Sequence, residues 1–366
     1  MTESPHKRLK LETVETVSPI HTPMHSLPKS ICYLIVQSFA APFDLLNWIR
    51  NTTISDQDLV WFLSLLPWNV ITTQPQNQQP LYMQCATLAC TAGRLELVKW
   101  LHETYGICRY PGQKGGCAFY LDPPVMFSYA CEHGHLELVK YLREHVFSHK
   151  DCTLCQTSCD TCDPLEDYTA DSLGLASIRG HVPVVQYLCA EFRFSILDVV
   201  ELALHSACEH GRLEVARFLT NNYKLTKASF RVDSNLAELF RSVCKKGDVD
   251  TAIFLAITFE LTPAHAKSKY NSAMRTACKN GNLPLVQFLC SHFYQTWSNV
   301  TAENVEIMGA LKNAVAAGHV EIANYLIDWF EVPAKEVIRG AGFAMYGSSA
   351  YLAIAHAGLN SKTCGL

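Results

Sequence analysis

Apolar side chains return along this chain at a helical spacing, and the arrangement repeats. It is plainest in two segments, ACEHGHLELVKYL beginning at Ala130 and ACEHGRLEVARFL beginning at Ala207. Two, five and eight residues after the glycine of each segment there is an apolar side chain, and positions three apart lie near one face of a helix. Charged and polar side chains occupy several of the positions between them. The pattern therefore predicts an amphipathic helix after each glycine.

The same glycine returns at several further places. It occurs at Gly93, Gly134, Gly180, Gly211, Gly247, Gly281 and Gly318, with spacings of 41, 46, 31, 36, 34 and 37 residues. Small residues, mostly alanine and cysteine, stand four and three positions before it and allow a short helix to approach its neighbours closely. The glycine suits the left-handed turn that ends such a helix. Each unit is thus predicted to be a short helix, a tight turn and a second helix.

A pair of helices this small cannot bury its own apolar face, whereas stacked pairs share one continuous core. The repetition therefore predicts an all-α solenoid. The spacing averages in the middle thirties, which fits ankyrin or tetratricopeptide repeats better than longer helical repeats or leucine-rich repeats.

The residues favour one of these two families. The segment LHSACEHGRLEV, which begins at Leu204, resembles the ankyrin pattern LHxAxxxGHLEVV, and GHLELVKYL and GHVEIANYL are typical of its second helix. The resemblance covers residues 80–330. It implies an ankyrin-repeat solenoid of about seven to eight units that binds a protein partner on its concave face and has no enzymatic activity. The usual TPLH opening is almost absent, and only His205 keeps its histidine. Such relaxed repeats resemble those of protists and large DNA viruses.

Four segments follow from these patterns. We expect a disordered tail at 1–26, an N-terminal helical cap or F-box-like segment at 27–79, the ankyrin array at 80–335 with insertions near 106–124 and 145–170, and a degenerate last repeat or cap at 336–366.

The segment before the array has two interpretations. Leu27-Pro28 and Asp44-Leu45-Leu46 resemble parts of an F-box, which implies a substrate adaptor of a ubiquitin ligase. The alternative is a helical cap over the apolar face of the first repeat, which solenoids require. Short helices are expected at 30–39, 42–50 and 55–66, and Ser55 or Asp56 is expected to cap the last of them.

Composition excludes several classes of function. The 366 residues are 49% hydrophobic and 17% charged, and the net charge of −4 argues against general nucleic-acid binding. The most apolar stretch, ICYLIVQSFAAPFDLLNWI, contains Gln37, Pro42 and Asp44, so we expect buried helices and no membrane span. The first thirty residues lack the apolar centre of a signal peptide. We expect a cytoplasmic monomer, with nuclear import through the basic stretch Lys7–Lys10 as an alternative.

Eleven of the sixteen cysteines fall into two groups. Seven occupy repeat positions and are expected to be small buried side chains in a reducing compartment: Cys90, Cys131, Cys208, Cys244 and Cys278 before the glycine, and Cys189 and Cys290 near the end of the second helix. Another four form C-x2-C-x3-C-x2-C, namely Cys152, Cys155, Cys159 and Cys162. Two such knuckles suit a structural zinc site, in which His149, Cys108 or Cys117 could take part. The alternative is a metal-free, cysteine-rich insertion.

Candidate binding residues come from the resemblance, which implies that a partner contacts the two positions before each glycine. The candidates at these positions are Glu132, His133, Arg179, Glu209, His210, Lys245, Lys246 and Lys279. Three of them are lysines, which would favour a partner with an acidic patch. The alternative is that they only solvate a helix end and complement its dipole. Histidine directly after the glycine, as at His181 and His319, is common in the family and is expected to be structural. The sequence has no H-E-x-x-H, G-x-S-x-G or Walker motif, so no catalytic residue is proposed.

Overall fold

The structure is a computed structural model that describes residues 55–65, 81–105, 123–146, 165–294 and 305–333. Over these ranges every regular element is a helix. The chain forms two compact units, 1–121 and 122–366, and each is taken by itself below. The F-box-like segment at 27–50, the cysteine cluster and the predicted C-terminal cap lie outside the described residues. No helix among the described residues has both the length and the apolarity needed to cross a membrane.

In the first unit two helices pack on a third. The helices α3 (Asp56–Leu65) and α5 (Leu81–Ala92) both contact α6 (Leu95–Tyr105). As the sequence suggested, Ser55 caps α3: its hydroxyl oxygen accepts a hydrogen bond of 3.1 Å from the Asp58 amide. Arg94, directly after the turn glycine, forms an ion pair of 2.8 Å with Asp56. The contact fixes α3 on the turn of the first helix pair.

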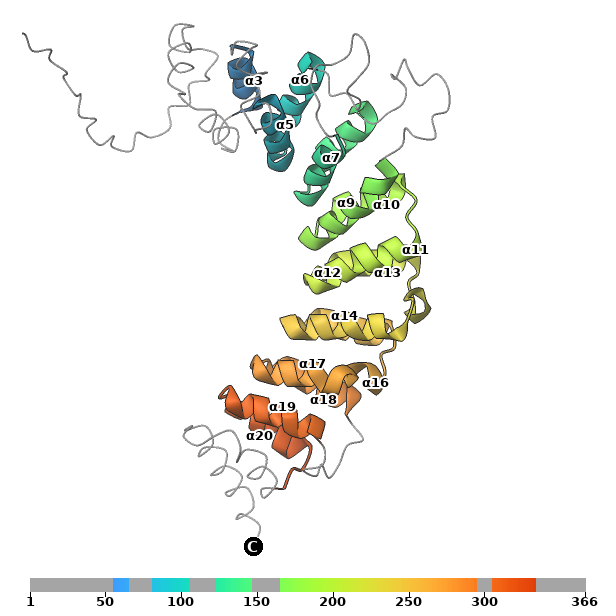
Figure 1. The fold of residues 1–366 in the computed structure, drawn as a ribbon, viewed down its shortest axis with the longest axis vertical. Helices are drawn as coiled ribbons and strands as arrows, with labels where there is room; N and C mark the ends of the chain where they lie inside the picture. Colours follow the sequence, from blue (N-terminus) through green and yellow to red (C-terminus); the bar gives the residue numbers. More distant parts are fainter. Residues whose placement is uncertain (1–54, 66–80, 106–122, 147–164, 295–304, 334–366) are drawn as a thin grey trace, which may run out of the picture. The chain divides into compact units, whose positions relative to one another are not determined.

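The second unit is a stack of helix pairs (Figure 1). The first helices are α7 (Pro123–Glu132), α9 (Leu165–Arg179), α12 (His205–Glu209) with α11 (Ile196–Asp198) and η4 (Val199–Leu204) leading into it, α14 (Asp233–Lys246), α17 (Ser268–Lys279) and α19 (Val305–Ala316). The second helices are α8 (Leu136–Tyr141) with η2 (Leu142–Val146), α10 (Val182–Glu191), α13 (Leu213–Tyr223), α15 (Val249–Thr258), α18 (Leu283–Phe293) and α20 (Val320–Trp329). Two short helices, η5 (Lys227–Ser229) and α16 (Pro263–Ala266), lie in the connections.

The helices form two rows because each type packs on its own kind. First helices contact the first helices of the neighbouring pairs, from α7 and α9 to α17 and α19. Second helices do the same, from α8 and α10 to α18 and α20. The core runs continuously between the rows, as expected for stacked units that cannot be stable singly. We call the outer surface of the first row the first-helix face.

The buried stripe of the second helix differs in part from the prediction. Positions five and eight after the glycine are fully buried in every described pair, for example Val139 and Leu142. Position two, such as Leu136, is only half-buried because it begins the helix. Position four is buried instead, at Leu97, Leu138, Val184, Val215, Thr251, Leu285 and Ile322. Positions four and eight are one turn apart, so they lie on the same face as position five.

The turn glycines have the conformation that the sequence predicted. Their φ angles run from 66° to 85°, a left-handed region in which a side chain is strained. At Gly211 the amide donates to the Cys208 carbonyl at 3.2 Å, and the next amide, from Arg212, donates to the Ala207 carbonyl at 2.8 Å. The small residues before the glycine thus accept the hydrogen bonds that close the first helix.

Six of the seven repeat-position cysteines are buried as predicted, and Cys189 is the exception. All are free thiols, and Cys90, Cys131, Cys208, Cys244, Cys278 and Cys290 are buried, while Cys189 is half-buried. Burial raises the pKa of the Cys290 thiol to about 12. A thiol with so high a pKa is protonated and unreactive at neutral pH. These cysteines therefore act as small apolar side chains.

The helix α9 extends into the region predicted as an insertion. It begins at Leu165, so residues 165–170 of the segment 145–170 are helical. Its buried stripe includes Thr169 and Ser172, which are 3% and 0% exposed, and the Ser172 hydroxyl lies 2.9 Å from that of Ser128 on α7. Because two buried positions are polar, an apolar pattern does not reveal the start of this helix.

Candidate functional site

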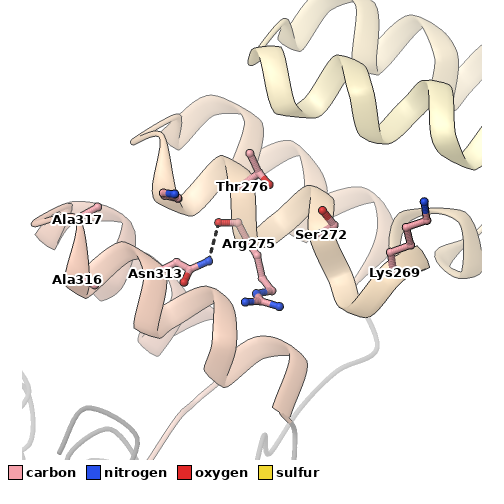
Figure 2. A pocket seen from close by; sticks show the side chains of 8 residues that line it. Lys269, Ser272, Arg275, Thr276, Asn313, Ala316 and Ala317 are labelled. Carbon is pink, nitrogen blue, oxygen red and sulfur yellow. Dashed lines mark hydrogen bonds between the residues drawn. The ribbon is translucent and has the colours of Figure 1, made fainter. Parts of the chain in front are cut away.

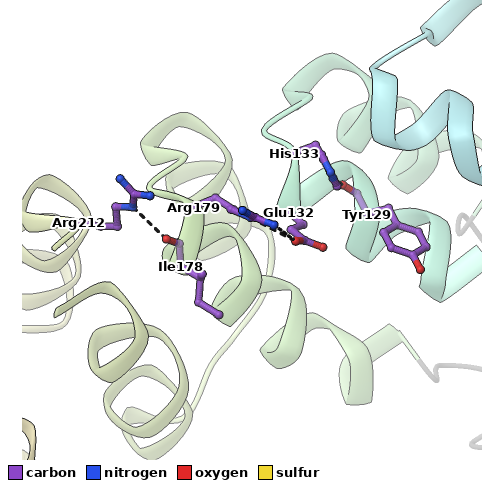
Figure 3. A network of polar contacts seen from close by, with 6 residues as sticks. All are labelled: Tyr129, Glu132, His133, Ile178, Arg179 and Arg212. Carbon is purple, nitrogen blue, oxygen red and sulfur yellow. Dashed lines mark hydrogen bonds and ion pairs between the residues drawn. The ribbon is translucent and has the colours of Figure 1, made fainter. Parts of the chain in front are cut away.

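Glu132 and Arg179, two of the candidates before the glycines, bind each other across neighbouring first helices. The Arg179 guanidinium donates to one carboxylate oxygen of Glu132 through Nη2 at 2.7 Å and Nε at 3.2 Å (Figure 3). The Arg179 side chain is 54% exposed, so the pair contributes little to stability. It does position both groups at the edge of the first-helix face.

The two candidate histidines turn back onto their own helices. Nδ1 of His133 lies 3.0 Å from the Tyr129 carbonyl, and Nδ1 of His210 lies 2.9 Å from the Ser206 carbonyl. Since a carbonyl only accepts, each Nδ1 carries the proton in this arrangement. These histidines satisfy carbonyls at the helix ends.

Glu209 is also engaged within the protein. Its carboxylate accepts a hydrogen bond of 2.7 Å from the Ser242 hydroxyl, and Lys246 lies 4.0 Å away. The Ser242 hydrogen bond, with a smaller contribution from Lys246, lowers the pKa of Glu209. Glu209 thus links α12 to α14.

Lys245 and Lys279 differ from the other candidates. Both side chains are exposed, and among the described residues neither ammonium group forms an ion pair. Their backbone carbonyls are used: Asn280 Nδ2 donates to the Lys245 carbonyl at 3.1 Å, and His319 Nε2 lies 3.1 Å from the Lys279 carbonyl. The backbone at these positions is held while the charges remain available.

From Gly180 onward, the residue after the turn glycine lies against the turn of the preceding pair. Arg212 Nε donates to the Ile178 carbonyl at 3.0 Å (Figure 3), and Asn282 Nδ2 donates to the Gly247 carbonyl at 2.8 Å. A Cβ at Gly134 would lie 2.5 Å from His181 Nδ1, and one at Gly281 would lie 2.6 Å from His319 Cε1. We call this series of contacts the turn ladder. His181 and His319 therefore have the structural role that the sequence predicted.

The turn ladder has a consequence for stability against acid. Burial lowers the pKa of His181, as do the nearby His135, His133 and Arg179, and a hydrogen bond to the Glu132 carbonyl opposes them. The folded protein therefore binds this proton more weakly than the unfolded chain, whose histidine pKa is about 6.5. The stabilisation is complete above pH 6.5 and is lost as the pH falls through 6.5 towards the lower folded pKa. Burial also lowers the pKa of His265, so this residue contributes to the loss of stability in acid in the same way.

We therefore expect the urea midpoint to be lower at pH 5.0 than at pH 7.5, and the difference to shrink in His181→Gln. Glutamine keeps an N–H donor for the Glu132 carbonyl but cannot gain a charge. Equal pH dependence of the variant and the unchanged protein would contradict this account.

A hollow of the first-helix face lies between α17 and α19 (Figure 2). Its volume is about 530 Å³, and it is lined by Lys269, Ser272, Arg275, Thr276, Lys279, Asn313, Ala316 and Ala317. The Asn313 side chain faces α17 and donates a hydrogen bond of 3.2 Å to the Arg275 carbonyl. We call it the α17–α19 cavity.

One end of this cavity is formed by an unusual stretch of backbone. Lys269, Tyr270 and Asn271 have φ angles of 49°, 57° and 59°, so three side-chain-bearing residues in succession are left-handed. Each costs about 1–2 kcal/mol relative to the right-handed form. Asn271 is fully buried and its side-chain oxygen accepts a hydrogen bond from the Tyr294 hydroxyl. That contact anchors the turn, which leaves Tyr270 81% exposed.

A second hollow, of about 340 Å³, lies at the start of α14 and beside η4. Its charged lining is Glu201, Glu238 and Arg231, with Arg231 3.4 Å from Glu201. Glu238 also lies 3.8 Å from Lys269 of the α17–α19 cavity. This ion pair connects the linings of the two hollows.

Comparison with protein families assigns this architecture. The family model for ankyrin repeats, in three copies, matches residues 127–229. These residues are ankyrin repeats. The matched segment contains the turns at Gly134, Gly180 and Gly211, so the left-handed glycine and the turn ladder are features of its ankyrin repeats. A comparison with curated proteins found no match. Ankyrin repeats suggest a role in protein–protein interaction.

Among the residues that the structure describes, no group of three or more His, Cys, Asp or Glu side chains is suited to a metal ion. The predicted zinc ligands Cys152, Cys155, Cys159 and Cys162 lie outside the described residues. Zinc binding by this cluster stays a prediction.

Sequence reasoning found Lys279 but missed the rest of the α17–α19 cavity. A signal was present, because Ser272, Thr276 and Lys279 are three or four residues apart, which is the spacing of one helix face. Only the two positions before each glycine were considered. Asn313 could not be paired with Arg275 from sequence, since their proximity depends on the stacking of two repeats.

Proposed function

We propose that the protein is a non-enzymatic ankyrin-repeat scaffold that binds a protein partner through its first-helix face. The array in this proposal spans 80–335, beyond the matched segment, because the turns at Gly247, Gly281 and Gly318 have the same left-handed conformation. The fold alone does not specify a partner, so the partner is determined by the residues on the surface.

The observation that carries the proposal is the α17–α19 cavity. It combines a hollow of about 530 Å³ with exposed Arg275 and Lys279, which form no ion pair within the described part of the chain. Several other charges of the face are matched internally, as between Glu132 and Arg179, whereas Lys245 is exposed and unpaired among the described residues but lines no printed hollow. Unmatched charges in a hollow are available for a partner, and complementary charge speeds and directs association.

Photo-crosslinking in the native cells tests this proposal. A photoreactive phenylalanine analogue at Ser272, in the cavity, is expected to form adducts with a partner protein. The matched control places it at Ile257 of α15 in the second-helix row, which is 63% exposed. Adducts at Ile257 and none at Ser272 would place binding on the opposite row and contradict the proposal. Ligase components captured equally by both variants would favour the F-box-like alternative at 27–50.

A further inference from the structure

We infer that the α17–α19 cavity binds carboxylate side chains of an extended acidic segment of the partner protein. This inference rests on the proposed function and adds the chemistry of the partner. It starts from the charge of the lining. Three of the lining residues are cationic, namely Lys269, Arg275 and Lys279, and none is acidic.

The polar groups of the cavity suit a carboxylate. The planar guanidinium of Arg275 can donate two parallel hydrogen bonds to the two oxygens of one carboxylate. The Ser272 and Thr276 hydroxyls lie on the same lining and can each donate one more. Asn313 helps to fix the site, because its side chain already holds the Arg275 backbone carbonyl.

Small residues at the end of α19 leave space for the cavity. At the two positions before the glycine, where five of the other six repeats carry Glu, His, Arg or Lys, this repeat has Ala316 and Ala317. Gly309 lies under the Arg275 side chain, and a Cβ there would come within 3.5 Å of Nε. The guanidinium therefore lies along α19 with no side chain beneath it.

The cavity-lining residues Ser272, Arg275, Thr276 and Lys279 form a stripe along α17. This stripe has the length of a short extended segment. From Ser272 to Lys279 the helix rises by about 10 Å at about 1.5 Å per residue. An extended chain covers the same length in about three residues at 3.3 Å each. Since alternate side chains of an extended segment point the same way, two carboxylates two residues apart can both face the stripe.

The neighbouring charges limit which anion fits. The charged lining residues of the second hollow are Glu201, Glu238 and Arg231, and Arg231 is already paired with Glu201. This hollow therefore offers no unpaired cation to a longer polyanion, and the net charge of the chain, −4, disfavours one. A short acidic peptide segment can end before this hollow, whereas a nucleic-acid strand continues its charge across it.

Fluorescence polarisation at low salt tests the inference on the full-length protein. The probe is a labelled peptide, Ser-Glu-Ser-Glu-Ser-Glu-Ser, and the control probe replaces each glutamate by glutamine. We expect the glutamate peptide to bind at least tenfold more tightly than the glutamine peptide. Arg275→Gln with Lys279→Gln should weaken binding at least tenfold, and Lys245→Gln with Lys246→Gln, which makes the same charge change outside the cavity, should change it less than twofold.

Three results would overturn the inference: equal binding of both peptides, equal loss in the two double variants, or tighter binding of a single-stranded oligonucleotide of equal charge. Circular dichroism of the variants checks folding, and substitutions at these exposed positions are expected to leave the urea midpoint essentially unchanged. If the peptide fails while Ser272 still crosslinks a partner, the partner chemistry is wrong and the binding face stands. If both fail, the proposed function fails as well.

Discussion

Gly281→Ala is expected to lower the free energy of unfolding by about 3 kcal/mol, because two costs coincide at this turn. Its φ of 74° places any side chain in the left-handed region, at about 1–2 kcal/mol. The new Cβ would also lie 2.6 Å from His319 Cε1, and such overpacking costs about 1–3 kcal/mol. Moving the imidazole aside would break its 3.1 Å hydrogen bond to the Lys279 carbonyl. Urea unfolding followed by circular dichroism measures the difference.

The chain supplies a matched control for this prediction. Gly318 has a φ of 81°, yet no described atom lies within 4 Å of a Cβ built there. Gly318→Ala should therefore show only the backbone cost of about 1–2 kcal/mol. In a His319→Ala background, the loss of unfolding free energy caused by Gly281→Ala should fall to the same value, since the obstructing ring is gone. If Gly281→Ala and Gly318→Ala lower the free energy of unfolding equally in the unchanged background, the turn ladder has no energetic importance.

Phe240→Ala should be the most damaging truncation near the middle of the array, at about 3–5 kcal/mol. The ring is fully buried on α14 and packs edge-to-face on Phe293 of α18, with centroids 5.6 Å apart. It therefore joins one repeat to the next. In a stack held by contacts between neighbours, weakening one interface can let the two sides unfold separately. We expect a lower midpoint and a broader or two-step urea transition.

Ile257→Ala serves as the control for this truncation. The side chain is 63% exposed on α15, in the same repeat as Phe240, so its loss should change stability by less than about 0.5 kcal/mol. A single sharp transition of Phe240→Ala at an unchanged midpoint would show that this interface does not couple the repeats.

Much of the fold could be predicted from sequence because each repeat carries the same local requirements. The left-handed glycine, the small residues before it and the buried positions five and eight after it all recur at fixed offsets. Position four was missed, since a strict spacing of three led to Leu136 when Leu138 is the buried residue. A helix has 3.6 residues per turn, so its buried stripe alternates steps of three and four.

The candidate site was harder to predict because its properties arise between repeats. Glu132 and Arg179 are 47 residues apart and form an ion pair, and nothing local marks them as partners. Lys246 and Lys279 look alike in sequence, yet Lys246 lies near Glu209 and Lys279 lines a cavity. The cavity itself depends on what is missing from α19, at Gly309, Ala316 and Ala317. Contacts across a stack and the absence of side chains are not visible in a single repeat.

The turn ladder has a direction along the chain. The side chains that occupy a turn, such as Arg212 at Gly180 and His319 at Gly281, come from the pair that follows it. During synthesis, which proceeds from the N-terminus, a newly made turn therefore lacks its covering side chain until the next pair has left the ribosome. Each repeat would be completed by its successor, so the order of translation matches the order in which the turns become fixed.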